Sequence, residues 1–209
     1  MLAQFFTIGL LMLLSSMLPG PDFALVVKNS VTHSRRAGLY TSLGVGVAIL
    51  VHISYCMLGL AIVISKSLVL FSIIKYIGAA YLIYLGISSL MSKPNVIAAK
   101  DDNQASQKTQ ISAFVAFRQG FLCNLLNPKA TLFFLALFTV IIKPATPVYW
   151  EMVYAAEMFL IITGWFCGLT LLLSHPKILA SLNRVEKYIT KALGVFLVGF
   201  GVALAFIKK

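Results

Sequence analysis

The chain consists of long apolar runs separated by short polar or proline-containing segments. None of the runs alternates apolar and polar residues as barrel strands do, and each is long enough to cross a bilayer core as a helix, which takes about 20 residues. The six runs are residues 2–31, 38–65, 68–91, 111–142, 149–174 and 188–207. The pattern predicts an all-α membrane protein with six transmembrane helices.

The single long polar stretch, residues 92–110, separates two groups of three runs. We therefore expect two three-helix halves, residues 1–91 and 111–209, joined by a polar linker. The first run has no basic leader and no small-residue cleavage site after it, so we expect it to be retained as a helix rather than removed as a signal peptide.

The first run of each half is interrupted by proline. The interruptions, Gly20-Pro21-Asp22 and Asn127-Pro128-Lys129, are 107 positions apart. Because three spans are an odd number, the second half would enter the membrane from the opposite side, which gives the inverted repeat found in many transporters. Chance similarity between apolar segments is the alternative. The third runs are also weakly similar, at an offset of 115: Tyr81, Tyr84 and Gly86 correspond to Phe196, Gly199 and Gly201.

Composition supports the membrane assignment, since 60% of the residues are hydrophobic and only 11% are charged. The net charge of +11 does not indicate nucleic-acid binding, because no basic stretch forms a compact domain. Eleven of the 17 lysines and arginines fall on the side of the first, third and fifth loops, five fall on the other side, and Lys129 lies within a run. The positive-inside rule then places the basic loops in the cytoplasm of a bacterial inner membrane and both termini outside, although Lys208 and Lys209 argue mildly the other way.

The two proline breaks predict a polar cavity inside the membrane, because lipid cannot satisfy the backbone groups that a broken helix frees. Asn127 is a good N-cap with Pro128 at the first helical position, and Gly20 and Pro21 can play the same two parts. Each break would start a half-helix whose N-terminus points into the protein. Such N-termini hold anions, and the carboxylate of an amino acid fits that description.

Asp22 and Lys129 occupy equivalent places after the breaks, and Asn124 lies one turn before Pro128. Ionisable groups in a bilayer face a cavity or one another. Asp22 and Lys129 could pair, or Asp22 could hold a substrate ammonium. The structural alternatives are that Asp22 only complements its helix N-terminus and that Lys129 only binds carbonyl groups. We take Gly20, Pro21, Asp22, Asn124, Asn127, Pro128 and Lys129 as candidate substrate-binding residues.

Three residues are candidates for proton coupling: Asp22, Glu157 and His52. His52 shares a helix face with Gly44 and Ala48, where it could equally be a structural hydrogen bonder. Glu157 lies about 10 Å along its helix from Trp150, and its alternative role is to extend towards the membrane interface. The expected membrane partners are lipids. The acids do not form a metal-binding motif, and no cofactor is expected.

The breaks resemble motifs of the lysine-exporter (LysE) superfamily, in particular its homoserine/threonine resistance (RhtB) family. Pro19-Gly20-Pro21-Asp22 is similar to the family's first-helix motif, and the most specific match runs from Arg118-Gln119-Gly120-Phe121 through Asn124 to Asn127-Pro128-Lys129-Ala130. Weaker matches are Arg35-Arg36-Ala37-Gly38, Leu43-Gly44 with His52, and Gly78-Ala79-Ala80-Tyr81-Leu82 with Leu85-Gly86. Many members carry LPQF after the fourth-helix motif, whereas this chain has Leu137-Phe138-Thr139-Val140, which is nearer to the threonine-exporter-like subgroup.

The resemblance implies proton-driven export of amino acids such as threonine or homoserine, without enzymatic activity. The residues suit a net-neutral substrate, because no second acid is placed for a basic side chain, and a homodimer is possible. One alternative is a membrane thiol–disulfide electron carrier, which needs two cysteines able to meet. Cys56, Cys123 and Cys167 form no CxxC pair and are expected to be reduced. A metal-ion exporter of related helix arrangement is the other alternative.

Overall fold

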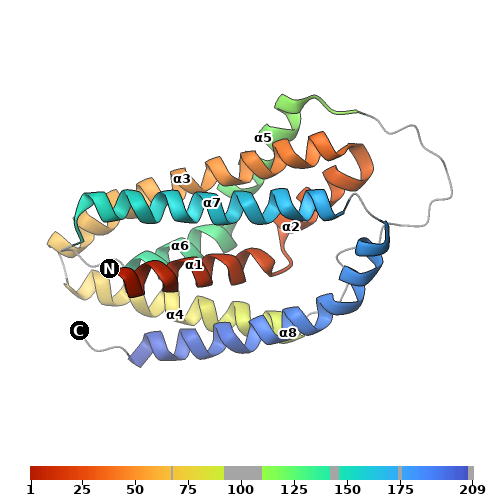
Figure 1. The fold of residues 1–209 in the computed structure, drawn as a ribbon. Coiled ribbons are helices and arrows are strands. Elements are labelled where there is room, and N and C mark those ends of the chain that lie inside the picture. Colours follow the sequence, from red (N-terminus) through yellow and green to blue (C-terminus); the bar gives the residue numbers. More distant parts are fainter. Residues whose placement is uncertain (67, 92–109, 142–145, 174–175, 207–209) are drawn as a thin grey trace.

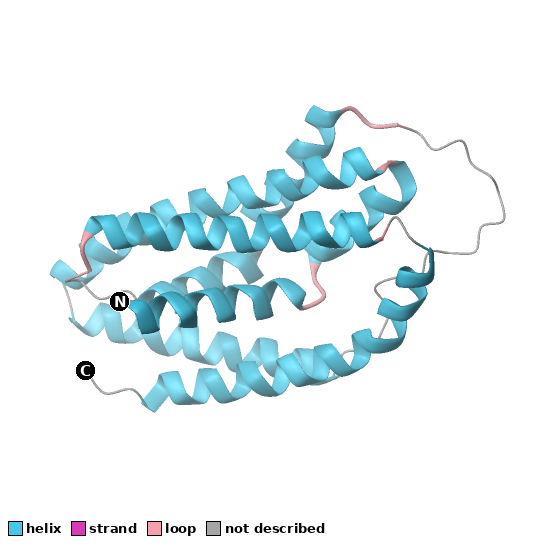
Figure 2. Ribbon diagram, viewed as in Figure 1, coloured by secondary structure: helices cyan, strands magenta, loops and turns pink. Residues whose placement is uncertain are grey.

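The fold of the chain is described by a computed structural model that covers residues 1–66, 68–91, 110–141, 146–173 and 176–206. Helices joined by short loops account for almost all of these residues, and none of them lies in a strand (Figures 1 and 2). The prediction of an all-α protein is confirmed. The elements are α1 (Leu2–Met17), α2 (Pro21–Lys28), the π-helical turn η1 (Asn29–His33), α3 (Arg35–Lys66), α4 (Leu68–Met91), α5 (Ala113–Leu125), α6 (Pro128–Ile141), α7 (Val148–Leu172) and α8 (Pro176–Phe206).

Most helix ends fall close to the ends of the apolar runs, but the predicted start of the last helix is wrong. We expected it at residue 188, whereas α8 begins at Pro176. Proline suits the first position of a helix, where its missing N–H has no partner to lose. The segment 176–187 mixes charged and apolar residues, so an apolar run detects only the later part of the helix.

Among the described residues, two stretches are single helices long and apolar enough to cross a membrane, Arg35–Gly59 and Val148–Leu172. Two pairs of shorter helices also meet this length and hydropathy criterion when each pair is taken as one broken span. Leu2–Met17 and Pro21–His33 meet at 62°, and Ala113–Leu125 and Pro128–Thr139 meet at 57°. Shorter apolar helical stretches lie at Tyr76–Met91 and Thr190–Val202. The described part therefore contains two to four candidate spans.

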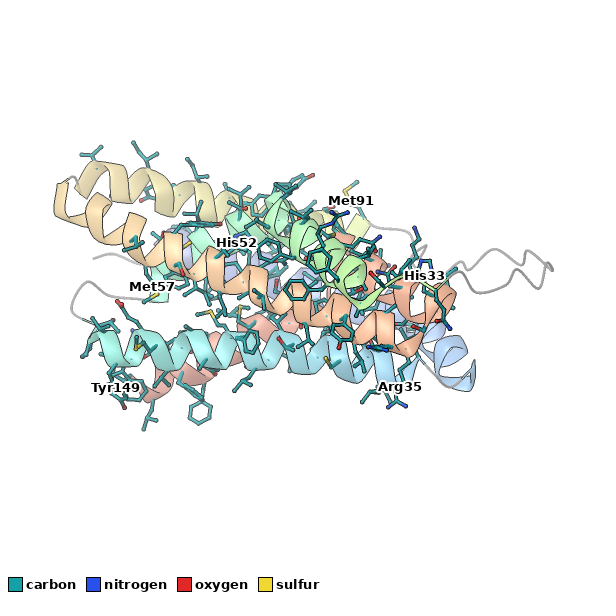
Figure 3. The ribbon with its side chains drawn as sticks, turned by 90° about the horizontal axis from the view of Figure 1, so that it is seen from above. His33, Arg35, His52, Met57, Met91 and Tyr149 are labelled. Carbon is teal, nitrogen blue, oxygen red and sulfur yellow. The ribbon has the colours of Figure 1, made fainter. Side chains whose placement is uncertain are left out.

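The helices form an elongated bundle in which α3 packs against α5 and α7, α4 packs against α6 and α8, and α1 packs against α7 (Figure 1). The N-terminus and the C-terminal end of α8 lie at the same end of the bundle. Tyr149 lies near that end of α7, while His33 and Arg35 lie at the opposite end and His52 lies between the two ends (Figure 3).

The antiparallel pair α4 and α8 makes two close crossings that involve glycine. A Cβ atom built on Gly86 would lie 2.6 Å from the Gly194 carbonyl oxygen and 2.8 Å from the Val198 nitrogen. A Cβ atom built on Gly201 would lie 2.9 Å from the Ala79 carbonyl oxygen and 3.1 Å from the Ile83 nitrogen. Adding 115 to the positions of Ala79, Ile83 and Gly86 gives those of Gly194, Val198 and Gly201, so the two crossings correspond to each other. The third runs are similar in sequence at the same offset.

The close packing of α4 on α8 predicts a large difference between two glycines of α8. Gly201→Ala should destabilise the protein by about 1–3 kcal/mol, because the added methyl group overpacks the crossing against backbone atoms. Gly199→Ala is the matched control, since a Cβ atom at Gly199 has no neighbour within 4 Å. Thermal unfolding of the purified proteins in detergent measures the difference. Equal melting temperatures for the two variants would contradict this packing.

Candidate functional site

Two helix breaks face each other in the middle of the bundle. Gly20 is the N-cap of α2, and Pro21 occupies its first turn. At the second break, Pro128 begins α6, and the Asn127 side-chain oxygen accepts a hydrogen bond from the Lys129 backbone N–H at 3.0 Å. Both predicted cap arrangements are confirmed. The breaks bring together residues that are more than 100 positions apart in the chain.

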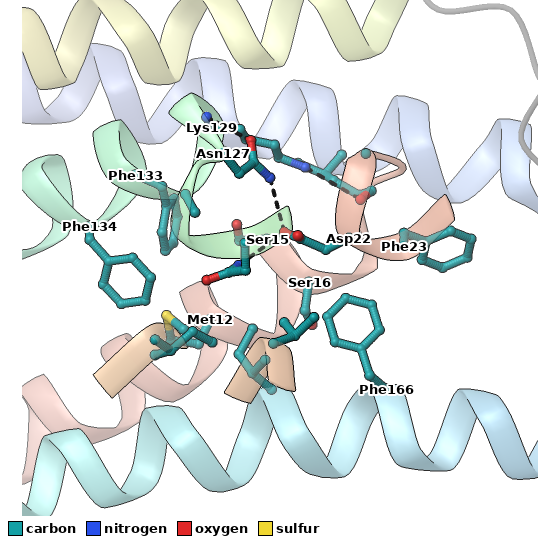
Figure 4. Close-up of a pocket in the computed structure, with 17 residues that line it drawn as sticks. Met12, Ser15, Ser16, Asp22, Phe23, Asn127, Lys129, Phe133, Phe134 and Phe166 are labelled. Atoms are coloured by element: carbon teal, nitrogen blue, oxygen red, sulfur yellow. Dashed lines mark hydrogen bonds between the residues drawn. The ribbon is translucent and has the colours of Figure 1, made fainter. Parts of the chain in front are cut away.

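The carboxylate of Asp22 is held by two amide side chains from the other half of the chain. Its Oδ2 atom accepts hydrogen bonds from Asn124 Nδ2 and Asn127 Nδ2, each at 3.0 Å (Figure 4). The Oδ1 atom of Asp22 is buried without a hydrogen-bond partner, and so is Oδ1 of Asn124. Since Asn124 must turn its NH₂ group towards the carboxylate, its oxygen is left free to accept. Two buried acceptors at the second break and Asp22 are therefore without a hydrogen-bond partner.

The ammonium group of Lys129 reaches the first break. Its Nζ atom donates to the Leu18 carbonyl oxygen at 3.4 Å, at the end of α1. A Cβ atom built on Gly20 would lie 3.2 Å from this Nζ, so glycine leaves room for the cation there. Within the described residues, the hydrogen bonds of Asp22 come from amides rather than from Lys129. Direct pairing of the two charges is thus not the arrangement that this structure adopts.

Asp22, Asn124, Asn127 and Lys129 line one cavity of about 50 Å³. Asp22 is the sole acid and Lys129 the sole base among the residues that line it. The remaining wall combines backbone at Gly20, two hydroxyl side chains and a set of large apolar side chains. These other lining residues are Met12, Ser15, Ser16, Leu18, Phe23, Val45, Ile49, Ala130, Phe133, Phe134, Ile162 and Phe166. The cavity thus offers opposite charges in apolar surroundings, an arrangement that suits a small zwitterion.

His52 of α3 contacts residues on both sides of the second break. It is fully buried, and its ring stacks on Phe134 with 5.3 Å between ring centroids and 5° between planes. Its Nε2 atom donates to the Asn124 backbone oxygen at 3.2 Å, and its Nδ1 atom accepts from the Tyr55 hydroxyl. Both ring nitrogens are therefore occupied, and the imidazole fixes the backbone that carries Asn124.

Glu157 does not join the cavity with Asp22. It lies on α7 with 8% of its surface exposed, and it packs against Gly9 of α1. Five of the seven predicted substrate-binding residues line the cavity, whereas Pro21 and Pro128 begin α2 and α6 at the two breaks. The structure separates Glu157 from them.

A polar cluster that the sequence reasoning missed lies at the start of η1. The amide of Asn29 donates to Thr41 Oγ1 at 2.8 Å and to Gln119 Oε1 at 2.9 Å, which joins η1, α3 and α5. Asn29 is 1% exposed. A polar residue inside an apolar run was the available signal, and Gln119 belongs to the motif before the second break.

The thiol groups of Cys56, Cys123 and Cys167 are all free. Cys56 is buried, and the other two are half-buried. Across the described ranges, no three His, Cys, Asp or Glu side chains gather in a group that could hold a metal ion.

Known proteins are similar in sequence to this chain over most of its length. The family described as LysE type translocator matches residues 13–207. An uncharacterized membrane protein of Bacillus subtilis, YrhP, is 34% identical over 88% of this chain and 90% of its own length. Threonine efflux proteins of Salmonella typhi and Escherichia coli K12 are 29% and 28% identical, each over 98% of both chains. No solved structure matches significantly. Together with the apolar helices, these relatives identify a multi-pass membrane protein.

The double role of Asn127 predicts that two of its substitutions differ in their response to pH. Asn127→Ser keeps an N-cap for α6 but loses the donor to Asp22. Asn127→Asp also keeps the cap but sets a second acid against Asp22, which should cost about 1–3 kcal/mol more at neutral pH. Acidic pH should reduce that extra cost, because a protonated carboxyl can donate to its neighbour. Melting temperatures at neutral and acidic pH measure both effects, and a pH-independent gap between the variants would contradict the Asp22–Asn127 contact.

Proposed function

The chain belongs to the LysE type translocator family, and from that premise we propose that it exports small amino acids across the bacterial inner membrane. The observation that carries the proposal is the pair of buried, unpartnered acceptors at Asp22 and Asn124, in one cavity with the Lys129 ammonium. An amino acid brings the complementary groups, a cation with several N–H donors and an anion, on neighbouring atoms.

The substrate ammonium would bind Oδ1 of both Asp22 and Asn124. Its carboxylate would lie towards Lys129 and towards the N-terminus of α2, where proline and glycine leave the first turn open. Asn127 would hold Asp22 in place and start α6 at Pro128. Burial of both charged ends in apolar surroundings strengthens each contact relative to water, provided that every charge has its partner.

The substrate class that fits is a net-neutral amino acid with a small side chain, such as threonine, homoserine or serine. A basic side chain would need a second acid in the cavity, and Asp22 is the sole acid in its lining. Ser15 and Ser16 supply hydroxyl groups in a wall that is otherwise largely apolar. Two relatives are threonine efflux proteins, which supports the same class of substrate.

We further propose that the architecture is six transmembrane helices in two inverted three-helix repeats, residues 1–91 and 111–209, with residues 92–110 as a cytoplasmic linker. The two breaks, 107 positions apart, support this arrangement. The two close crossings of α4 and α8, at Gly86 and Gly201, support it as well, because they correspond to each other at an offset of 115. The linker residues 92–109 lie outside the described part of the chain.

Export would run by exchange with protons. Moving one positive charge across the membrane is worth about 2.3 kcal/mol per 100 mV, so a proton that enters while a neutral substrate leaves uses the potential. Asp22, Glu157 and His52 are the candidate proton carriers. Of these, His52 has both ring nitrogens occupied by Asn124 and Tyr55, which favours a positioning role for it.

Overproduction of the protein should let cells tolerate excess threonine or homoserine and accumulate less of it. Asp22→Asn and Lys129→Gln should each abolish the effect, because loss of one partner of a buried charge costs about 3–5 kcal/mol. The double variant should lose less than the sum, since both charges act through one substrate. Arg36→Gln, on the exposed surface at one end of the bundle, is a control that should retain export. Export that persists without a proton gradient, or export of cationic amino acids alone, would refute the mechanism.

Topology can be tested by cysteine labelling. In a background without Cys56, Cys123 and Cys167, a single cysteine in the linker, residues 92–110, should react with a membrane-impermeant reagent only after the inner membrane is opened. The reason is the excess of lysine and arginine on that side. A cysteine introduced at Pro147, before α7, should react from outside. Labelling of the linker in intact cells would reverse the proposed orientation.

A further inference from the structure

A second site lies in a groove between α1 and α7, apart from the cavity at the two breaks. Glu157 is more than nine-tenths buried there, and its Oε2 atom has no hydrogen-bond partner. The walls beside it are largely apolar and include Phe6, Leu10, Leu13 and Leu160. Trp165 also lines the groove, and its buried Nε1 atom has no hydrogen-bond partner either. An ionised carboxylate without a partner is costly in such surroundings, whereas the neutral acid is not, so the groove is built for a carboxyl group that carries a proton.

No other acid and no base lines the groove within the described residues. The nearest titratable neighbour is Tyr154, one turn earlier on α7, whose hydroxyl donates to the Met1 carbonyl oxygen at 3.2 Å and is 3.3 Å from Gln4 Oε1. On α2 and α3, which also pack on α7, the titratable groups inside the bundle include Asp22, His52 and Cys56, and none of these three lines the groove. Glu157 therefore has no charged partner to satisfy it.

The carboxyl group of Glu157 lies against α1 at Gly9. A Cβ atom built on Gly9 would lie 2.5 Å from Glu157 Oε1, so the carboxyl group rests directly on the α1 backbone. Hydration of an ionised carboxylate would require this contact to open. Protonation of Glu157 thus favours the closed packing of α1 on α7 that the structure adopts.

Helix α1 is also a wall of the substrate cavity. Met12, Ser15 and Ser16 line the cavity, while Gly9 and Leu13 line the groove. On α7, Ile162 and Phe166 line the cavity and Glu157 lines the groove. Any change in the α1–α7 distance at Gly9 therefore reshapes the cavity at the same time.

We propose that Glu157 binds the coupling proton in the α1–α7 groove and that α1 transmits its protonation to the substrate cavity. The inference rests on the proposed amino-acid export but assigns proton and substrate to different sites. The Glu157 carboxylate takes up the proton from water while the groove is open, and the groove then closes on the neutral acid. The proton leaves when α1 moves away again and water enters. Asp22 stays with the substrate ammonium throughout.

The experiment uses the full-length protein in liposomes with labelled threonine. Counterflow, the exchange of labelled for unlabelled threonine at equal pH, requires only the substrate site, whereas net transport driven by a pH gradient requires the proton site as well. Glu157→Gln should retain counterflow and lose all stimulation by the gradient, while Asp22→Asn should lose both. Glu151→Gln, on the same helix, should behave as the wild type in both assays.

Each contrary outcome has a distinct meaning. Gradient-driven transport by Glu157→Gln at the wild-type rate would overturn the proton site, and so would loss of counterflow in a folded Glu157→Gln protein. Absence of counterflow in the wild type for every amino acid tested would instead refute the proposed function.

A hydrophobic carbodiimide supplies a test on the unaltered protein, because it modifies protonated carboxyl groups that face apolar surroundings. It should label Glu157 and not Glu151, more at acidic than at alkaline pH. Absence of label on Glu157 at every pH would overturn the proposal. Gly9→Ala should slow gradient-driven transport because its methyl group displaces the carboxyl group. Gly168→Ala is the matched glycine control on α7, since a Cβ atom there has no neighbour within 4 Å.

Discussion

A helix that breaks inside a membrane leaves backbone donors and acceptors that lipid cannot satisfy, and this constraint organises the centre of the molecule. Side chains at the second break form hydrogen bonds with groups at the first break. Lys129, just after the second break, donates to the Leu18 carbonyl at the first, and Asn127 binds the carboxylate of Asp22 while it caps its own helix. The cavity lies between the two breaks. Its acceptors without a partner, Oδ1 of Asp22 and Oδ1 of Asn124, are those that the hydrogen bonds between the breaks do not use.

The surrounding helices keep the two breaks in register. His52 of α3 binds the backbone of Asn124 and stacks on Phe134 beyond the break, so that one side chain touches both α5 and α6. Asn29 adds a second connection from η1 to α3 and α5. These contacts are buried and neutral, and a buried network of this kind stabilises one arrangement only when all of its members are satisfied. Polar contacts therefore join α3 and α5, whereas α1 meets α7 along a contact that includes one carboxyl group.

Local chemistry was readable from the sequence, and long-range contacts were not. Pro21 and Pro128 with their capping neighbours predicted both breaks, because proline and N-cap preferences act over a few residues. The partners of Asp22 stayed undecided between Lys129 and a substrate, since Asn124 and Asn127 are 102 and 105 positions away and nothing local fixes such distances. The start of α8 was missed because its first turns are not apolar. Glu157 was recognised as unusual, but its groove depends on how α1 packs on α7.

The glycine at the first break has a consequence for the history of the chain. Gly20 leaves the space that the Lys129 ammonium occupies, and under the proposed repeat the residues that correspond to each other are Gly20 with Asn127 and Asp22 with Lys129. Two identical halves would set aspartate against aspartate or lysine against lysine, and like charges repel in a buried site. A symmetric ancestor assembled from two copies of one half could not have offered both signs of charge at these two places. Under the proposed repeat and the proposed substrate, both signs of charge at these two places require that the two halves differ in sequence there.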